Sequence, residues 1–119
     1  MIRYTTEPGS PVVEITVEGK VSDSDLRAIM ERLRLDLERN GKTRLIEVIR
    51  NFSGIEPKAI WSDMTVGIPL ARKVTQVAVV ADQRWIRALS HLGHIFTTAE
   101  LKIFALENLA QAREWISQA

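Results

Sequence analysis

The sequence predicts a single α/β domain, with a mostly parallel central sheet of about five strands, an N-terminal hairpin and four helices. Strand-like and helix-like segments follow one another in the order ββαβαβαβα with short connections, which favours a layered sheet with right-handed crossovers. Two nearly continuous apolar runs, LIEVI at 45–49 and QVAVVA at 76–81, are typical of parallel strands covered on both faces. The 119 residues, 45% of them hydrophobic, suffice for one core and leave no room for a second domain.

The chain is expected to open with a β-hairpin. IRYTT at 2–6 and VVEITVE at 12–18 have strand composition, and Pro8-Gly9 between them suits a tight turn. The apolar residues that alternate along the second strand should share one face of the sheet: Val13, Ile15 and Val17.

A helix should follow the hairpin, with Ser22 as its capping residue and Gly41 as its stop. Leu35 falls on the outer side of this helix, where it is either an ordinary exposed leucine or a contact for a protein partner. The apolar residues at helical spacing should lie on the sheet: Leu26, Ile29, Met30, Leu33 and Leu37.

The second half of the chain continues the alternation. Asp82 is expected to cap a helix after the strand at 76–81, and LKIFAL at 101–106 should form the last strand. The helix after Asp82 has an apolar face made of Trp85, Leu89, Leu92 and Phe96, and the last helix has one made of Leu109, Ala112 and Ile116.

Charge and composition narrow the classes of function. Sixteen Lys and Arg against fifteen Asp and Glu give a net charge of +1, and the arginines of the first helix alternate with acidic residues, so we expect no nucleic-acid partner. The absence of cysteine excludes disulfides and thiolate chemistry. The sequence shows no signal-peptide pattern and no apolar run long enough to span a bilayer. We therefore expect a cytoplasmic protein, with peripheral contact to a membrane left open.

Residues 57–74 read as a helix that begins at Pro57 and carries a glycine and a proline inside it. Gly67 and Pro69 would together cost about 4 kcal/mol in a straight helix, so we expect a kink or hinge there. One interpretation is a helix that bends over the sheet, with Trp61 at the edge of the core. The other is a lid whose apolar face opens to a ligand or a membrane surface. The expected apolar ligand contacts are Phe52, Ile60, Trp61, Met64, Ile68 and Trp85.

Polar residues follow the carboxyl ends of three predicted strands and should gather at one rim of the sheet, where ligands usually bind in open α/β folds. The alternative is ordinary loop and cap chemistry, particularly for Ser53 and Asp82. The rim residues are Lys20, Asn51, Ser53, Asp82 and Gln83.

Catalysis, a bound metal and a cofactor are not predicted. His91 and His94 are spaced to share a metal on a helix, but no third ligand is evident. Ser53 lacks both a GxSxG turn and an evident His partner, and the sequence contains no P-loop and no GxGxxG. We therefore expect no catalytic residues, which leaves a small hydrolase at the rim as the weakest alternative.

A series of short segments carries a family resemblance: VEGKV at 17–21, NFSG at 51–54, AIWSD at 59–63, VAVVAD at 77–82 followed by Trp85, FTTAE at 96–100, Phe104, and AREWI at 112–116. In this order they resemble the SpoIIAA-like family of small single-domain proteins, which are often grouped with STAS domains. The resemblance lies in the order of the segments and runs over nearly the whole sequence.

The resemblance implies two kinds of function. In the anti-sigma-factor antagonists of this superfamily, a DLSG-like turn leads into a DSSG-like segment whose serine is phosphorylated by a partner kinase. The turn is present here as NFSG, while AIWSD replaces the second motif and makes Ser62 the nearest serine. Other members look structurally akin to lipid-carrying domains of the Sec14 type, which implies apolar ligands or membrane surfaces.

We therefore expect a non-catalytic binding domain for an apolar or lipid-like ligand, or for a membrane surface, acting through the kinked helix 57–74. The alternative is a STAS-type regulatory protein-interaction module. In that case Leu35, Trp115 or the rim would contact a protein partner or a second copy of the chain, and Ser62 would be the candidate phosphosite.

Overall fold

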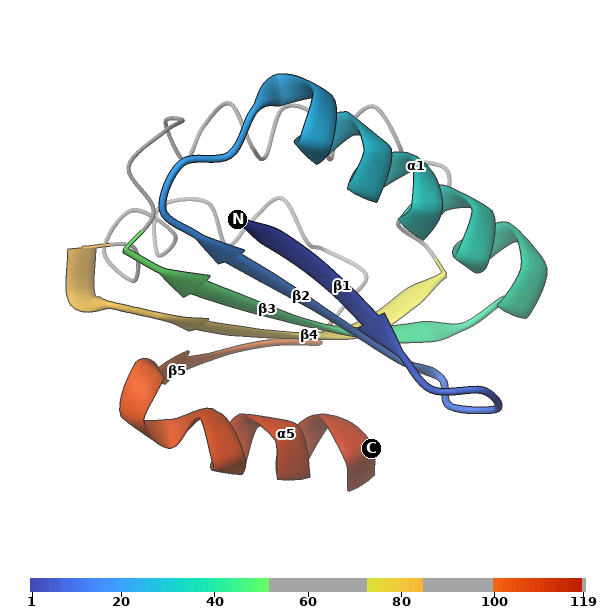
Figure 1. Cartoon of the computed structure of the whole chain (residues 1–119). Helices are drawn as coiled ribbons and strands as arrows, with labels where there is room; N and C mark the ends of the chain where they lie inside the picture. The colour runs from blue at the N-terminus through green and yellow to red at the C-terminus, as the bar shows by residue number, and fades with distance from the viewer. Residues whose placement is uncertain (52–72, 85–99, 119) are drawn as a thin grey trace.

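Five strands form one mixed sheet in the computed structural model, which describes residues 1–51, 73–84 and 100–118. Helix α1 lies on one face of this sheet and helix α5 on the other (Figure 1). The α/β class, the five strands and the N-terminal hairpin are therefore confirmed. The strands are β1 (Ile2–Thr6), β2 (Val12–Glu18), β3 (Thr43–Arg50), β4 (Val74–Ala81) and β5 (Glu100–Ala105).

The strands lie side by side in the order of the sequence, β1-β2-β3-β4-β5. Strands β1 and β2 are antiparallel, while β2, β3, β4 and β5 are parallel. Parallel strands end at the same edge of a sheet, so the chain leaves β2, β3 and β4 at a common rim. This is the edge where sequence analysis placed the polar residues.

The hairpin turn has the geometry that its sequence predicts. The backbone N–H of Ser10 donates to the carbonyl of Glu7 at 3.0 Å, which closes a four-residue turn with Pro8 and Gly9 at its centre. Gly9 has φ of 80°, a left-handed value that a type II turn requires at its third position. The local sequence therefore sets the antiparallel pairing of β1 with β2.

Helix α1 (Asp23–Asn40) has both predicted ends. The Ser22 hydroxyl accepts a hydrogen bond from the backbone N–H of Asp25 at 3.1 Å, as an N-cap does. At the other end, Gly41 adopts φ of 73° and its N–H donates to the carbonyl of Leu37 at 3.1 Å. These two residues fix the length of the helix that crosses over the sheet.

Replacing Ser22 with alanine should destabilise the fold by about 1 kcal/mol, because the N–H of Asp25 loses its acceptor. Urea unfolding followed by circular dichroism measures this difference. Ser24→Ala is the matched control, since it removes the hydroxyl that contacts Ser22 but leaves the cap bond in place. An equal loss in both variants would contradict the assigned cap.

Two apolar cores lie on the two faces of the sheet. On the α1 side, Leu33 and Leu37 are buried and Ile29 and Met30 are partly buried, as the helical spacing predicted, while the side chain of Leu26 lies outside the description. This α1-side core includes Val13, Ile15, Val17, Leu45, Ile49, Val77, Val79 and Ala81. The α5-side core includes Ile46, Val48, Ala78, Val80, Phe104, Ala112 and Ile116.

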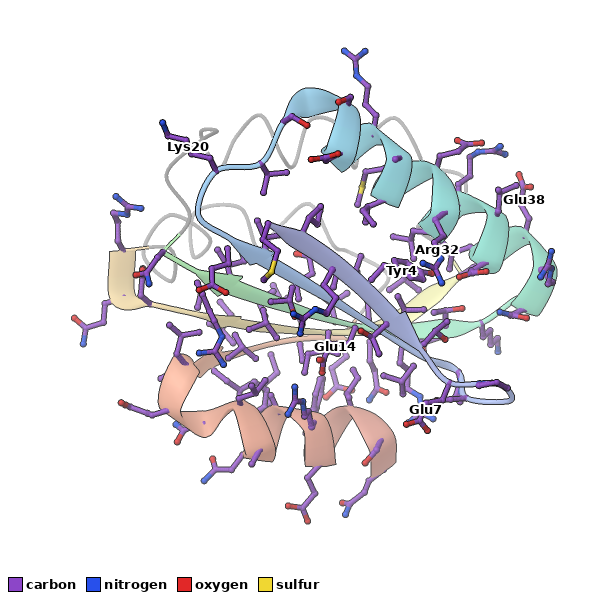
Figure 2. All side chains as sticks on the ribbon, viewed as in Figure 1. Tyr4, Glu7, Glu14, Lys20, Arg32 and Glu38 are labelled. Atoms are coloured by element: carbon purple, nitrogen blue, oxygen red, sulfur yellow. The ribbon has the colours of Figure 1, made fainter. Side chains whose placement is uncertain are left out.

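Helix α5 (Leu109–Gln118) follows a short 3-10 helix, η2 (Leu106–Asn108), and buries Ala112 and Ile116 against the sheet as predicted. Leu106 was expected to end the last strand but lies in η2 instead. Arg113 pairs with Glu14 of β2 at 2.9 Å, and the labelled Glu14 points toward α5 in Figure 2. The C-terminal helix is thus tied to the sheet by both apolar and charged contacts.

The predicted helix over 57–74 is wrong at its end. Val74 pairs with Thr43 as the first residue of β4, and the N–H of Thr43 donates to the carbonyl of Lys73 at 2.7 Å. Lys73 and Val74 therefore belong to the turn and the strand. The rest of that helix lies outside the described residues. Gln83 and Arg84 are helical directly after Asp82, where a helix was predicted to begin.

Candidate functional site

Three of the predicted rim residues stand at the same edge of the sheet. Val17, Ile49 and Ala81 occupy one level of the paired strands, and the chain then runs on to Lys20, Asn51 and Asp82 respectively. The N–H of Gly19 donates to the carbonyl of Arg50 at 3.3 Å, which joins the ends of β2 and β3. Lys20, Asn51 and Asp82 therefore follow strand ends at one edge of the sheet. Their role in binding a ligand stays a prediction, and Ser53 lies outside the described residues.

Asn51 turns the chain away from the end of β3. Its φ of 47° is left-handed, a conformation that asparagine tolerates better than most residues because its short amide can bond to nearby backbone. This backbone geometry explains an asparagine at the start of the NFSG turn. Asn51 therefore has a structural role at the rim that requires no ligand.

Two basic groups, the Met1 ammonium and the Lys20 amine, lie at the end of β2. The ammonium group of Met1 donates to the carbonyls of Glu18 and Lys20 at 2.6 and 2.9 Å, which holds the start of the chain against the end of β2. The Lys20 side chain is exposed and points away from the sheet in Figure 2. The exposed amine of Lys20 thus lies at the rim, next to strands whose residues on the α1 side are mostly apolar.

Glu47 stands in the middle of the α1-side core. It belongs to β3, where it alternates with Leu45 and Ile49, and the register places it between Ile15 of β2 and Val79 of β4. Its exposed fraction is 5%. Among the residues that the structure describes, no group makes a hydrogen bond or ion pair with its carboxyl. Burial raises the pKa of Glu47 to about 7.

Thr43 offers a contrast on the same strand. Thr43 and Glu47 are the two buried polar or charged residues among the described part of the chain. The Thr43 hydroxyl donates to the carbonyl of Gly41 at 3.1 Å, so its burial is compensated within the protein. Glu47 has no comparable bond to any of the described residues, and this sets it apart from Thr43.

Sequence reasoning missed Glu47 because LIEVI was interpreted as a nearly continuous apolar strand. The sequence does contain a clue, because Glu47 lies within LIEVI at 45–49, a strand that was predicted to be covered on both faces. Acidic side chains are rarely buried unless they are paired, so a charge at that place marks a candidate functional residue.

Tyr4 is the other ionisable side chain on the α1-facing side of the described strands, two strands away from Glu47. Its hydroxyl donates to the Asp36 carboxylate of α1, and the Arg32 guanidinium lies 4.2 Å from the centre of its ring. Figure 2 shows Tyr4 and Arg32 together between β1 and α1. Burial and the bond to Asp36 raise the pKa of Tyr4, so this phenol stays neutral at physiological pH.

The outer face of α1 is charged, as its sequence predicts. Arg34 pairs with Glu38 at 2.7 Å and also with Glu31, one turn away on the other side. Leu35 stands among these charges with an exposed fraction of 49%. Its outward position is confirmed, and it is one of two large hydrophobic residues exposed in the described part of the chain.

Trp115, the other predicted partner contact, packs within its own chain. Its ring centroid is 6.1 Å from that of Phe104, at the edge of the α5-side core. The Lys102 amine lies 5.7 Å from the Trp115 ring centre and 5.3 Å from the Phe104 ring centre. Trp115 therefore has intramolecular neighbours that account for its place in the fold.

All six predicted apolar ligand contacts lie outside the described residues, and so do the predicted hinge, phosphosite and histidine positions. The positions that lie outside the described residues are Phe52, Ile60, Trp61, Ser62, Met64, Gly67, Ile68, Pro69, Trp85, His91 and His94. Their roles stay predictions. Within residues 1–51, 73–84 and 100–118, no three His, Asp or Glu side chains gather as metal ligands would, and no helix is long and apolar enough to cross a bilayer.

The fold and the rim define a class: small α/β domains with an N-terminal hairpin, a parallel sheet and a polar edge at the strand ends. The chain belongs to the SpoIIAA-like family, and the sequence pattern of that family matches residues 12–117. It is similar in fold to an uncharacterized protein of the DUF3478 family with a SpoIIAA-like fold from Shewanella loihica PV-4. The TM-score is 0.68 at 20% sequence identity, and the match covers 98% of this chain and 92% of that one. No curated protein matches the sequence.

Proposed function

We propose that this chain is a non-catalytic binding domain for an apolar or lipid-like ligand, or for a membrane surface, with the rim as the entrance and segment 57–72 as the moving part. The α1-side face of the sheet supports this most directly. Its apolar side chains continue to the last level of the parallel strands, at Val17, Ile49 and Ala81, and the polar rim follows at once. Such a sequence of surfaces suits a molecule with one polar end and one apolar end.

The two halves of the proposed site have different origins. The sheet face and the rim are described by the structure, while the ligand contacts on segment 57–74 come from sequence. Trp61 is the most useful of these contacts, because indole emission shifts to the blue when the ring leaves water. Lys20 at the rim gives a feature in favour of the membrane-surface form of the proposal, since an exposed cation can meet an anionic lipid headgroup.

Tryptophan emission tests the proposal. Replacing Trp85 and Trp115 with phenylalanine leaves Trp61 as the reporter, and its emission should shift to the blue when octanol is added. Vesicles of phosphatidylcholine mixed with phosphatidylglycerol form the second arm, so that a shift with vesicles alone would identify a membrane surface. Gly67→Ala should reduce the shift, because the residue that gives hinge freedom is lost.

A matched control uses Trp115 as the reporter instead, with Trp61 and Trp85 replaced by phenylalanine. Trp115 lies against Phe104 on the α5 side of the sheet, away from the proposed site, so its emission should stay constant. Unchanged Trp61 emission in both the octanol and the vesicle arm would contradict the proposed function.

The second candidate is a STAS-type regulatory protein-interaction module, with Ser62 as its phosphosite. The exposed Leu35 on α1 is the residue through which such a module would contact a partner, because it offers an apolar side chain within a charged face. This candidate would replace the first if Trp61 emission failed to respond while the chain self-associated in a way that Leu35→Ser abolished. Sedimentation velocity of the two proteins measures that difference.

A further inference from the structure

Glu47 is buried without compensation from the residues that the structure describes. A carboxyl group removed from water loses its hydration, and this is costly unless hydrogen bonds or an opposite charge replace it. The neighbours of Glu47 in the sheet, Ile15 and Val79, supply neither. The next residue along the same level is Ile103 of β5, which is also apolar. The described residues around Glu47 therefore neither donate a hydrogen bond to its carboxyl group nor carry an opposite charge beside it.

Among the described residues, those of helix α1 that pack on this core offer no cation to Glu47. The α1 residues that pack against the same core are apolar, and they are Ile29, Met30, Leu33 and Leu37. Arg32 of α1 lies over the Tyr4 ring, and the Tyr4 hydroxyl is itself bonded to Asp36. A cation that pairs with the ionised form of Glu47 would therefore come from outside these described elements.

We infer that Glu47 anchors the polar end of a ligand, and that this ligand is an apolar molecule carrying a basic nitrogen; the inference rests on the proposed function and names its ligand class. A protonated amine donates charge-assisted hydrogen bonds to a carboxylate, and such bonds are about twice as strong as neutral ones. The apolar side chains around Glu47 match the rest of such a molecule. An alcohol would gain only a neutral hydrogen bond, and a fatty acid would bring a second negative charge.

Access from the rim is consistent with this ligand class. Glu47 is three residues before Arg50, the last residue of β3, so it lies about 10 Å below the rim at 3.3 Å per residue. Ile49 stands between them on the same face. A molecule that enters at the rim meets apolar surface first and the carboxyl afterwards, so an alkyl chain of moderate length can span the distance.

Isothermal titration calorimetry with octylamine, octanol and octanoate tests the inference on the full chain. At about pH 8, where Glu47 is ionised and an alkyl amine is still protonated, octylamine should bind about ten-fold more tightly than octanol. Octanoate should bind most weakly. Glu47→Gln should remove the preference for octylamine and change the affinity for octanol by less than about three-fold.

Two further readouts separate an anchoring carboxylate from a purely structural one. The preference for octylamine should grow as the pH rises through about 7, because Glu47 gains its charge there, and it should not grow in Glu47→Gln. Glu47→Asp keeps the carboxylate and should retain part of the preference. It also serves as the second variant if Glu47→Gln fails to fold.

The outcomes distinguish the two proposals. If none of the three compounds binds and vesicles have no effect on Trp61, the proposed function is wrong. If octanol and octylamine bind equally, in the wild type and in Glu47→Gln alike, the apolar site stands but Glu47 is not its anchor. A ten-fold preference that Glu47→Gln abolishes supports the inference.

Discussion

Glu47→Gln should make the chain more stable above about pH 7 and leave its stability almost unchanged below about pH 4.5. In the unfolded chain the carboxyl loses its proton near its ordinary pKa of 4.5, whereas burial holds the folded pKa near 7. The fold therefore favours the protonated form. Stability from this group is fully present below about pH 4.5 and is lost as the pH rises toward 7.

The expected difference is about 3 kcal/mol at pH 8, because each unit of pKa shift corresponds to about 1.4 kcal/mol. Glutamine has the same shape and stays neutral, so its variant lacks this loss. Urea unfolding of both proteins over a series of pH values gives the difference curve, from which the other ionisable groups cancel. A difference that stays flat from acid to alkaline pH would show that Glu47 is ionised in water-like surroundings.

Ile116→Ala should destabilise the fold by about 2 to 5 kcal/mol, the usual range for truncating a buried isoleucine. Ile116 has an exposed fraction of 1% and packs in the α5-side core. Its carbonyl also accepts a hydrogen bond from the Arg44 guanidinium at 2.6 Å, which joins α5 to β3. Urea unfolding measures the loss, with the exposed Gln118→Ala as the control for the same helix.

Ile116→Ala is also a control for the location of the proposed ligand site. Its side chain lies on the opposite face of the sheet from Glu47, so the variant should lose stability but keep the preference for octylamine over octanol. A loss of less than about 1 kcal/mol would contradict the role assigned to α5 in the second core. A changed preference would contradict the assignment of the ligand to the α1 side.

Local signals explain why much of the fold could be predicted. Pro8-Gly9, Ser22 and Gly41 each need only a few neighbouring residues to set a turn, a cap and a helix stop, and all three behave as expected. Helix spacing likewise identified the buried Leu33 and Ile116. These features depend on chemistry within one or two turns of the chain.

The errors arose where partners are distant in the sequence. Val74 was assigned to a helix, but its pairing with Thr43 of β3 makes it a strand residue, and no local pattern reveals that pairing. Glu47 was missed for a related reason. Its neighbours on the adjacent strands, Ile15 and Val79, cannot donate a hydrogen bond or offer a positive charge, and the local sequence does not reveal these neighbours. The candidate ligand contacts on 57–74 remain sequence-based predictions, and so does the ligand-binding role of the rim residues Lys20, Asn51 and Asp82.

The protonation of Glu47 can be followed by NMR from the chemical shift of its carboxyl carbon as the pH is varied. We expect Glu47 to titrate near pH 7 in the protein alone and at a lower pH when octylamine is present, because a bound cation favours the carboxylate. Glu47→Gln identifies the signal by its loss. A titration midpoint near 4.5 without ligand would contradict the burial of the Glu47 carboxyl. A midpoint that octylamine leaves unchanged would contradict the binding of an amine to Glu47.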